Sequence, residues 1–304
     1  MKVLLLGKNG QVGWELQRAL APLGELVALG RQGAQGLCGD LGDPAGLRAT
    51  VRELRPDVIV NAAAYTAVDR AEAEPELADA INGIAPGVLA EEAAALGALL
   101  IHYSTDYVFE GEGDRPWLED DPAAPVNVYG MSKWHGEEAV RAVNPFHLIL
   151  RTQWVYAARG RNFLATMLRL AADRDRLQVV DDQFGAPTHA ELIADVTAHA
   201  MRGVLAQPSL AGTYHLAARD ITSWHGYARY AIGVARELGW PIRVQNEAIV
   251  AVDSSAFPTP AKRPHNSRLA LDRIEQAFDL ALPDWRGGVF RTIEEWVTAA
   301  PISR

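Results

Sequence analysis

Cysteine is nearly absent from the sequence, since Cys38 is the only one among 304 residues. A single thiol has no partner within the chain, which excludes a disulfide framework and a cysteine-based zinc site. Long apolar runs are also absent. The run at Val3–Gly7 is too short for a signal peptide, and no stretch approaches the roughly 18 apolar residues of a membrane span. These absences predict a cytoplasmic protein with no membrane segment.

Positive charge is scarce as well. The chain has 29 Lys and Arg against 38 Asp and Glu, a net charge of −9, and no long basic run. This balance argues against nucleic acid as the main partner, and an anionic ligand would need a local site. Internal repeats and low-complexity tracts are lacking too. A hydrophobic fraction of 49% with 22% charged residues is typical of a globular protein with a sizeable core.

Short β-rich runs alternate with longer stretches that have the 3.6-residue periodicity of helices. Strands are predicted at Lys2–Leu6, Glu25–Leu29, Asp57–Val60, Leu99–Ser104 and Phe146–Leu150. Helices are predicted at Gln11–Leu23, Asp43–Leu54, Pro75–Leu96 and Tyr129–Val143. Strands that are apolar on both faces, joined by helices, indicate a parallel sheet covered on both sides. The sequence therefore predicts an α/β protein with a Rossmann-type doubly wound sheet.

The pattern becomes irregular after about residue 155. Further helices are predicted at Phe163–Arg174, Ala190–Leu205, Trp224–Leu238 and Gly287–Ala299, and the three prolines of Phe257–Pro264 indicate a loop. We expect a dinucleotide-binding domain over residues 1–154. A smaller mixed C-terminal part, residues 155–304, packs against it, and its later segments are free to return to the sheet.

The first strand runs into a glycine-rich loop, Gly7-x-x-Gly10-x-x-Gly13, which leads into a helix. Glycines at this spacing permit a tight turn and a close approach of backbone to phosphate, while the helix N-terminus offers free N–H groups. The loop, with Gln11 and Val12 inside it, predicts a dinucleotide site. An ordinary strand-to-helix turn is the alternative.

The second strand ends at Leu29-Gly30-Arg31, without the carboxylate that usually holds the ribose 2′-hydroxyl of NAD. A guanidinium here suits the 2′-phosphate of NADPH, because it can pair with phosphate through two N–H groups. A solvated surface arginine is the alternative. We expect Asp40, followed by Leu41, to end a third strand-like segment and to bind the adenine amino group, unless it is an ordinary loop aspartate.

Tyr129 and Lys133 are four residues apart, so on a helix they share one face. Ser104-Thr105-Asp106-Tyr107 follows a predicted buried strand, at the edge where open α/β sheets bind ligands. A lysine ammonium lowers the pKa of a nearby tyrosine from about 10, which makes proton transfer easier near neutrality. This group predicts proton-transfer catalysis with Thr105 orienting a carbonyl. Without the glycine loop and Thr105, Tyr129 and Lys133 would be interpreted as ordinary residues on the surface of a helix.

Several strings together resemble the extended short-chain dehydrogenase/reductase superfamily. They are the glycine loop, Asn61-Ala-Ala-Ala-Tyr-Thr, Ser104-Thr-Asp and Tyr129-x-x-x-Lys133. Others resemble the dTDP-4-dehydrorhamnose reductase family over essentially the whole chain: Gly10-Gln-Val-Gly-Trp-Glu-Leu, Tyr65-Thr-Ala-Val-Asp-Arg-Ala-Glu, Leu150-Arg-Thr-Gln-Trp-Val-Tyr, Asp182-Gln-Phe-Gly-Ala-Pro-Thr and Pro258-Thr-Pro-Ala-Lys-Arg-Pro.

This resemblance implies an NADPH-dependent reductase, with NADH as a second donor, acting on the C4 keto group of a dTDP-linked 6-deoxysugar. It implies a catalytic group of Thr105, Tyr129 and Lys133. The residues implied for the cofactor are Gly7, Gly10, Gln11, Val12, Gly13, Arg31, Asp40, Leu41, Ala62, Ala63, Ala64, Tyr129 and Lys133. Those implied for the substrate are Thr66, Thr105, Tyr107, Trp154 and Arg263. For Trp154 a place in the core is the alternative, and for Arg263 an exposed loop position.

Some members of the family bind Mg²⁺ through glutamates at the interface of a homodimer, which implies Glu15, Glu191 and Glu295 here. Solvated helix carboxylates are the alternative. The histidines, His102 among them, have no ligand spacing and are interpreted as structural. Two other functions stay open: a non-catalytic dinucleotide-binding subunit resembling the regulatory subunit of methionine adenosyltransferase, and a nucleotide-sugar epimerase or dehydratase. The first would bind NADPH without oxidising it.

Overall fold

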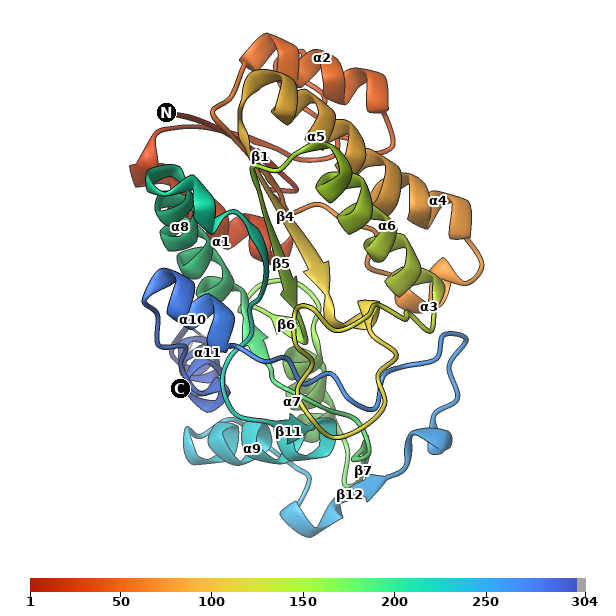
Figure 1. The fold of residues 1–304 in the computed structure, drawn as a ribbon. Helices are drawn as coiled ribbons and strands as arrows, with labels where there is room; N and C mark the ends of the chain where they lie inside the picture. Colours follow the sequence, from red (N-terminus) through yellow and green to blue (C-terminus); the bar gives the residue numbers. More distant parts are fainter. Residues whose placement is uncertain (300–304) are drawn as a thin grey trace.

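The centre of the computed structural model, which describes residues 1–299, is a six-stranded parallel sheet (Figure 1). The spatial order is β2-β1-β3-β4-β5-β10, so the direction of winding reverses between β1 and β3. The strands are β1 (Lys2–Leu6), β2 (Glu25–Leu29), β3 (Val58–Asn61), β4 (Leu99–Thr105), β5 (His147–Thr152) and β10 (Gly212–His215). The predicted Rossmann-type doubly wound fold is confirmed, and ligands of such sheets bind beside the point of reversal.

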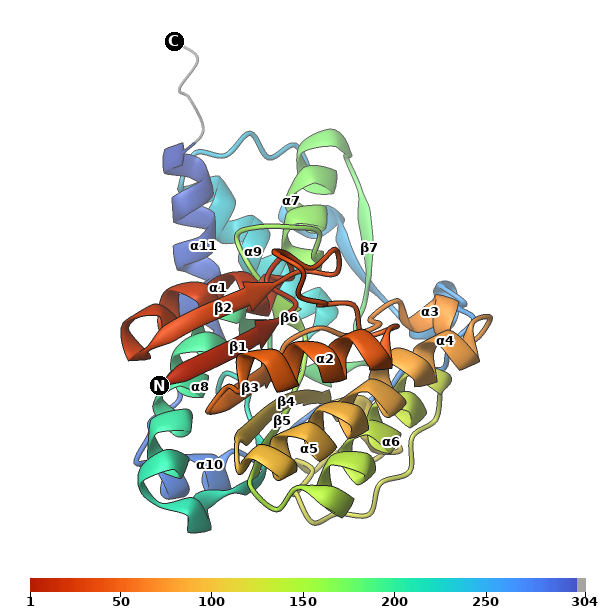
Figure 2. The ribbon, with the colours of Figure 1, turned by 90° about the horizontal axis from the view of Figure 1, so that it is seen from above.

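Helices cover both faces of this sheet (Figure 2). One layer contains α1 (Gln11–Leu20) and α8 (Ala190–Ala206), and the other contains α2 (Pro44–Leu54), α5 (Ala85–Leu96) and α6 (Val128–Val143). Because side chains alternate along a strand, Leu5 packs into the core beneath α1 and α8, whereas Leu4 packs into the core beneath α2 and α5. Both leucines are buried, which explains the uninterrupted apolar run that predicts β1.

The stretch predicted as one helix at Pro75–Leu96 is interrupted. It consists of α4 (Pro75–Asp79), a π-helical turn at Ala80–Ile84, and α5. Pro86 has no N–H to donate and its ring would collide with a carbonyl one turn earlier in a regular α-helix. The wider π turn shifts the hydrogen-bonding pattern by one residue just before Pro86, which relieves this conflict. The short helix α3 (Val68–Ala71) precedes this stretch and was not predicted.

The predicted third strand-like segment is wrong. Residues up to Asp40 form only an isolated bridge between Ala34 and Leu37. Glycines with positive φ, Gly33 and Gly36, curl the chain here, and an extended strand cannot contain such residues without breaking its pairing. Asp40 therefore lies on a loop beside the end of β2.

A second core lies below the sheet in the view of Figure 1 and contains Tyr156, Tyr227 and Trp285. The helices around it are α7 (Phe163–Asp173), α9 (Trp224–Glu237) and α11 (Trp285–Ala299). Three two-stranded sheets complete this part: β6 (Val155–Tyr156) with β9 (Thr188–His189), β7 (Leu177–Val180) with β12 (Ile249–Val252), and β8 (Phe184–Gly185) with β11 (Thr222–Ser223).

Later segments of the chain return to the sheet. Strand β10 pairs with β5, α8 packs against α1, and α10 (Asp272–Phe278) adds Ile274 and Phe278 to the same core. The chain thus passes between the two cores several times. No helix within residues 1–299 combines the length and the apolarity needed to cross a membrane.

Candidate active site

The glycine-rich loop joins β1 to α1 at the edge of the sheet where the winding reverses. Gly7 has φ +87°, and a Cβ built there would lie 2.6 Å from the amide nitrogen of Ala63. A Cβ at Gly13 would overlap the carbonyl oxygen of Gly7. Both positions therefore require glycine. Gly10 is the N-cap of α1 and has no side chain to accept from the first turn, so these N–H groups remain available to a phosphate.

The other expected cofactor residues surround this loop. The Ala62–Ala64 segment follows β3 and lies against Gly7, while Val12 packs on the sheet core and Leu41 is buried beside α2. Gln11 accepts a hydrogen bond through Oε1 from Asn162, the N-cap of α7, at 3.1 Å. This contact ties the loop to the second core. A backbone cradle with an uncapped helix start fits the diphosphate of a dinucleotide.

Arg31 and Asp40 form an ion pair, with Arg31 Nε 3.2 Å from Asp40 Oδ2. The other carboxylate oxygen accepts the amide proton of Gly42 at 2.9 Å. The Arg31 side chain is 77% exposed, so most of its guanidinium faces solvent beside the end of β2. This position suits contact with a 2′-phosphate, and Asp40 orients the arginine from the loop.

Thr105, the last residue of β4, is buried and stands at the centre of a hydrogen-bonded group. Its hydroxyl donates to Asp106 Oδ1 at 3.1 Å and accepts from the amide of Tyr107 at 3.2 Å. The Tyr129 hydroxyl lies near enough to Thr105 for the threonine hydroxyl to affect its pKa. The Tyr107 ring meets the Tyr129 ring edge-on, with centroids 5.6 Å apart. These contacts hold the two hydroxyl groups predicted for catalysis next to each other.

Burial governs the acid–base behaviour of this group. Burial raises the pKa of Tyr129 above its ordinary value, and the nearby hydroxyl of Thr105 opposes that rise. Burial also raises the pKa of Asp106 to about 7, a rise that the nearby hydroxyls of Ser267 and Thr105 oppose. We expected the ammonium of Lys133 to lower the pKa of Tyr129, but in the structure this ammonium is directed toward β4.

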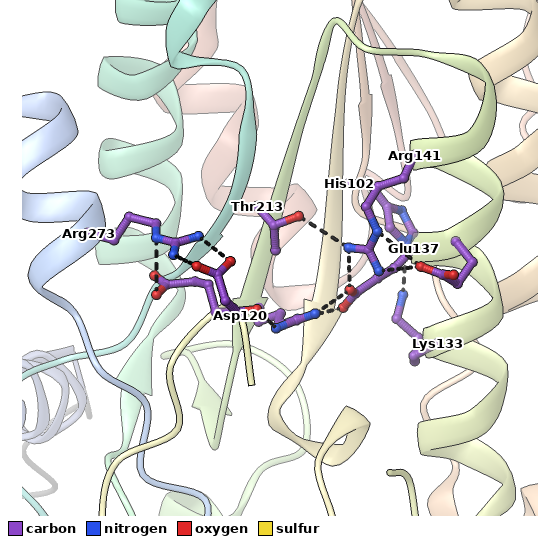
Figure 3. Close-up of polar contacts among 10 residues, drawn as sticks. His102, Asp120, Lys133, Glu137, Arg141, Thr213 and Arg273 are labelled. Carbon is purple, nitrogen blue, oxygen red and sulfur yellow. Dashed lines mark hydrogen bonds and ion pairs between the residues drawn. The ribbon is translucent and has the colours of Figure 1, made fainter. Parts of the chain in front are cut away.

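Lys133 Nζ donates to the carbonyl oxygen of Tyr103 at 2.6 Å. It also lies 3.3 Å from His102 Nε2 (Figure 3). The side chain lies in the interior, where burial lowers its pKa to about 8, a shift that the nearby carboxylate of Glu137 opposes. An amine with a pKa near neutrality can take up and release a proton during turnover.

The face of α6 that carries Tyr129 and Lys133 continues into a buried charge network (Figure 3). Glu137 accepts two hydrogen bonds from Arg151 of β5, at 2.9 and 2.7 Å, and one from Arg141 at 2.9 Å. Burial disfavours the Glu137 carboxylate, but the Arg151 guanidinium lowers its pKa below the ordinary value. This network is not among the sites predicted from the sequence. An arginine within the apolar strand pattern of β5 is the signal that could have revealed it.

A cavity of about 870 Å³ lies beside Tyr107, between α7, β7 and the loop before residue 265. Tyr107 and Arg263, both expected at the substrate, are among the lining residues. The other cations that line the cavity are Arg174, Arg176 and Lys262. Arg263 donates to Asp69 Oδ2 at 2.7 Å, which orients its guanidinium. A wall rich in cations suits a nucleoside diphosphate.

Trp154 follows β5 with a positive φ of 44°, an unusual conformation for a tryptophan. Its ring stacks on Trp224, with centroids 3.6 Å apart, and Trp224 lines the cavity. Trp154 therefore reaches the cavity wall through its partner. Thr66 is exposed ahead of α3 and is not part of the cavity lining.

Within the single chain, the three glutamates implied for Mg²⁺ are not arranged as a metal site, and the Mg²⁺ site expected at a homodimer interface stays a prediction. Burial, followed by repulsion from Glu191, raises the pKa of Glu15, with a smaller contribution from Glu295, so the three share one region. However, Glu15 pairs with Arg18 and Glu191 with Arg291. Within the described part of the chain, no group of three or more His, Cys, Asp or Glu side chains is arranged to hold a metal ion.

Taken together, the doubly wound sheet, the phosphate-binding loop and the Thr105, Tyr129 and Lys133 group define a nicotinamide-dinucleotide oxidoreductase of the short-chain dehydrogenase/reductase type. The sequence model of the family described as "RmlD substrate binding domain" matches residues 1–298. The chain belongs to this family, that of the dTDP-4-dehydrorhamnose reductases, and the resemblance predicted from the motifs is confirmed.

Relatives and solved structures support this placement. The dTDP-4-dehydrorhamnose reductase of Escherichia coli K12 is 54% identical over 302 residues, 99% of this chain and 100% of that protein. The spore coat polysaccharide biosynthesis protein SpsK of Bacillus subtilis is 36% identical over 97% of both chains. The structure of the Bacillus anthracis reductase in complex with NADP has a TM-score of 0.85 at 33% identity, covering 97% of this chain and 99% of that one.

Structural relatives outside the reductases share the fold alone. The NAD complex of a Thermus thermophilus UDP-glucose 4-epimerase has a TM-score of 0.76 at 20% identity, covering 99% of this chain and all of that one. The Bacillus anthracis structure thus holds NADP, and the Thermus thermophilus structure holds NAD. The homodimer and the cytoplasmic location expected from the sequence stay predictions.

Proposed function

We propose that the protein reduces the C4 keto group of dTDP-4-dehydro-6-deoxy-L-mannose, giving dTDP-L-rhamnose, with NADPH as the hydride donor. The observation that carries this proposal is the meeting of three features at one edge of the sheet. They are the phosphate-binding loop, the neighbouring side chains of Thr105 and Tyr129, and the cation-lined cavity.

The chain's own residues handle the proton and the position of the substrate. When bound, the reduced nicotinamide supplies the hydride that adds to C4. Tyr129 donates its hydroxyl proton to the C4 oxygen as negative charge develops there, and Thr105 orients that oxygen by a hydrogen bond. Lys133 lies one turn further along the same face of α6, so its ammonium can stabilise the phenolate left on Tyr129 once the side chain turns from the Tyr103 carbonyl toward Tyr129. Hydride and proton together convert the ketone into an alcohol.

The substrate binds in the cavity lined by these cations. Arg263, already oriented by Asp69, and its neighbour Lys262 pair with the diphosphate. The stacked Trp154 and Trp224 cover an apolar face of the sugar or the thymine and keep water away from the reacting carbon.

Arg31 supports NADPH as the preferred donor. Its guanidinium is exposed at the end of β2, where the ribose of a dinucleotide lies in this fold, and only its Nε is engaged by Asp40. The terminal N–H groups are thus free to pair with a 2′-phosphate.

The test is steady-state oxidation of NADPH with the keto-sugar by the purified enzyme. Tyr129→Phe should lower kcat by roughly 10²-fold or more, the usual size of a general-acid contribution, while the affinity for NADPH changes little. Tyr103→Phe is the matched control, because that hydroxyl bonds Thr197 and only the backbone carbonyl of Tyr103 meets Lys133. A protein that binds NADPH but does not oxidise it with this sugar would instead be a dinucleotide-binding subunit.

A further inference from the structure

His102 is a buried polar residue that the proposed chemistry does not use. It lies on β4, directly across from Asn61 of β3 in the strand register, and its side chain is almost fully enclosed. Burial, reinforced by the nearby charge of Lys133, holds the pKa of His102 well below its ordinary value, so the ring is neutral. A neutral imidazole carries one N–H, and its neighbours decide which nitrogen carries it.

Asn61 makes that choice. Its Oδ1 accepts the amide proton of Ala63 at 3.2 Å, so its Nδ2 is the atom that faces His102 Nδ1, also at 3.2 Å. Since an amide NH₂ can only donate, His102 Nδ1 must accept. Turning the Asn61 amide around would place two N–H groups against each other at Ala63. The proton of the His102 ring therefore lies on Nε2.

The protonated Nε2 of His102 faces Lys133. Nζ lies 3.3 Å away and already donates to the carbonyl of Tyr103 at 2.6 Å. If Lys133 is an ammonium, an N–H and an N–H⁺ confront each other without an acceptor. If Lys133 is a neutral amine, its lone pair accepts the Nε2 proton and every partner is satisfied. The contact therefore favours loss of a proton from Lys133.

The other ionisable groups near this contact do not reverse the argument. Glu137, one turn further along α6, favours the ammonium, but two hydrogen bonds from Arg151 engage its carboxylate. His147 approaches from β5, and burial lowers its pKa, so it adds no positive charge near neutral pH. His102 is thus the group in direct contact with Lys133 that distinguishes its two protonation states.

We propose that Asn61 and His102 are positioning residues of the reduction: Asn61 holds His102 with its proton on Nε2, and that N–H makes Lys133 a ready proton donor to Tyr129. This inference rests on the proposed function. After Tyr129 has given its proton to the C4 oxygen, the Lys133 side chain turns from the Tyr103 carbonyl toward Tyr129, on the same face of α6, and its ammonium returns a proton to the phenolate. The neutral amine of Lys133 then accepts a hydrogen bond from the N–H of His102, and a proton from solvent later restores the ammonium.

The first test does not depend on turnover. Imidazole ¹⁵N NMR of the full-length wild-type protein without substrate should show His102 with Nε2 protonated and Nδ1 unprotonated from neutral to alkaline pH. Asn61→Asp keeps the size of the side chain and an acceptor for Ala63, but its carboxylate accepts from Nδ1. We expect the His102 proton to move to Nδ1 in this variant. A proton on Nδ1 in the wild type would overturn the proposal, whatever happens to the variant.

The second test uses the pH profile of kcat. In Asn61→Asp, the freed lone pair of Nε2 accepts from the Lys133 ammonium, so the alkaline limb of the profile should move up by roughly one pH unit or more. The plateau of kcat should fall several-fold, because the proton is held more firmly. His102→Gln removes the imidazole and adds no charge to β3, so its alkaline limb tests the role of His102 apart from the effect of an added carboxylate. Asn246→Asp, an exposed site that pairs with Arg236, controls for the added charge.

The outcomes separate the two proposals. An unchanged alkaline limb in Asn61→Asp and His102→Gln, in variants whose KM for NADPH shows an intact site, would overturn the roles of Asn61 and His102. A wild-type protein with the expected tautomer but no oxidation of NADPH at any pH would instead overturn the proposed function, because it would show the arrangement without the reaction.

Discussion

Replacing Arg151 by methionine tests whether the charge network beneath the catalytic lysine is as buried as the structure shows. Arg151 and Glu137 have side-chain exposures of 3% and 0%, and two hydrogen bonds join them. Removing one member of a buried pair costs about 3–5 kcal/mol, because the remaining charge has lost its compensation. Arg141 keeps one contact with Glu137, which places the expected loss near the lower end, about 3 kcal/mol.

Urea unfolding measures this loss directly. The matched control is Arg243→Met, because Arg243 and Asp175 form an equally short pair with side-chain exposures of 58% and 74%. Exposed pairs contribute about 0–1 kcal/mol, so this variant should unfold close to wild type. The double variant Arg151→Met with Glu137→Leu should recover much of the loss, since no buried charge is left alone.

A second consequence of Arg151→Met reaches the active site. The Glu137 carboxylate lies one helical turn from Lys133 and already opposes the effect of burial on that amine. Without Arg151 it acts more strongly, so the pKa of Lys133 should rise above about 8 and the alkaline limb of kcat should rise with it. A stability loss as small as that of Arg243→Met, with an unchanged limb, would refute the account of this network.

Three further results are expected. Arg31→Ala should weaken NADPH binding by roughly 1.5–3 kcal/mol and leave NADH nearly unaffected, as measured by fluorescence titration; equal losses would show that Arg31 does not contact the 2′-phosphate. Trp154→Ala should raise KM for the keto-sugar and spare NADPH binding, whereas a collapse of the melting temperature with an unchanged KM would make Trp154 a packing residue. Asp106→Asn should be more stable than wild type at pH 8 and equal to it near pH 4. The folded-state pKa of Asp106 is raised to about 7, so wild-type stability is lost as pH rises from the unfolded pKa of about 4; urea midpoints at the two pH values decide this.

The sheet and the glycine loop could be predicted from the sequence because both depend on local patterns. Five of the six central strands contain apolar runs, which are buried in β1, β3, β4 and β5 and partly buried in β2, and the loop needs glycine at Gly7 for its positive φ. The short strands β6, β8 and β9 have only two residues each, too few for any periodicity. The strand predicted before Asp40 does not form, because the positive φ angles of its glycines are incompatible with an extended, paired strand.

The candidate site could be predicted only in part, for a related reason. Thr105, Tyr129 and Lys133 lie in recognisable strings, and the fold brings them to one edge of the sheet. The partners of Lys133 could not be predicted, because Tyr103 and His102 meet it only once β4 packs against α6. Pairings between distant polar residues depend on which side chains the packing brings face to face, and a single sequence does not encode that in its spacing.

The return of the chain to the sheet has a consequence for dissecting the protein. Strand β10 pairs with β5 along residues 148–151, and it comes from far beyond the first core in sequence. A fragment ending at residue 154 would leave that side of β5 as an open edge, with Leu148, Ile149 and Leu150 unprotected. Such an edge recruits strands from other molecules. We therefore expect the isolated fragment to aggregate, and the dinucleotide site to exist as a folded unit only in a chain that continues through β10.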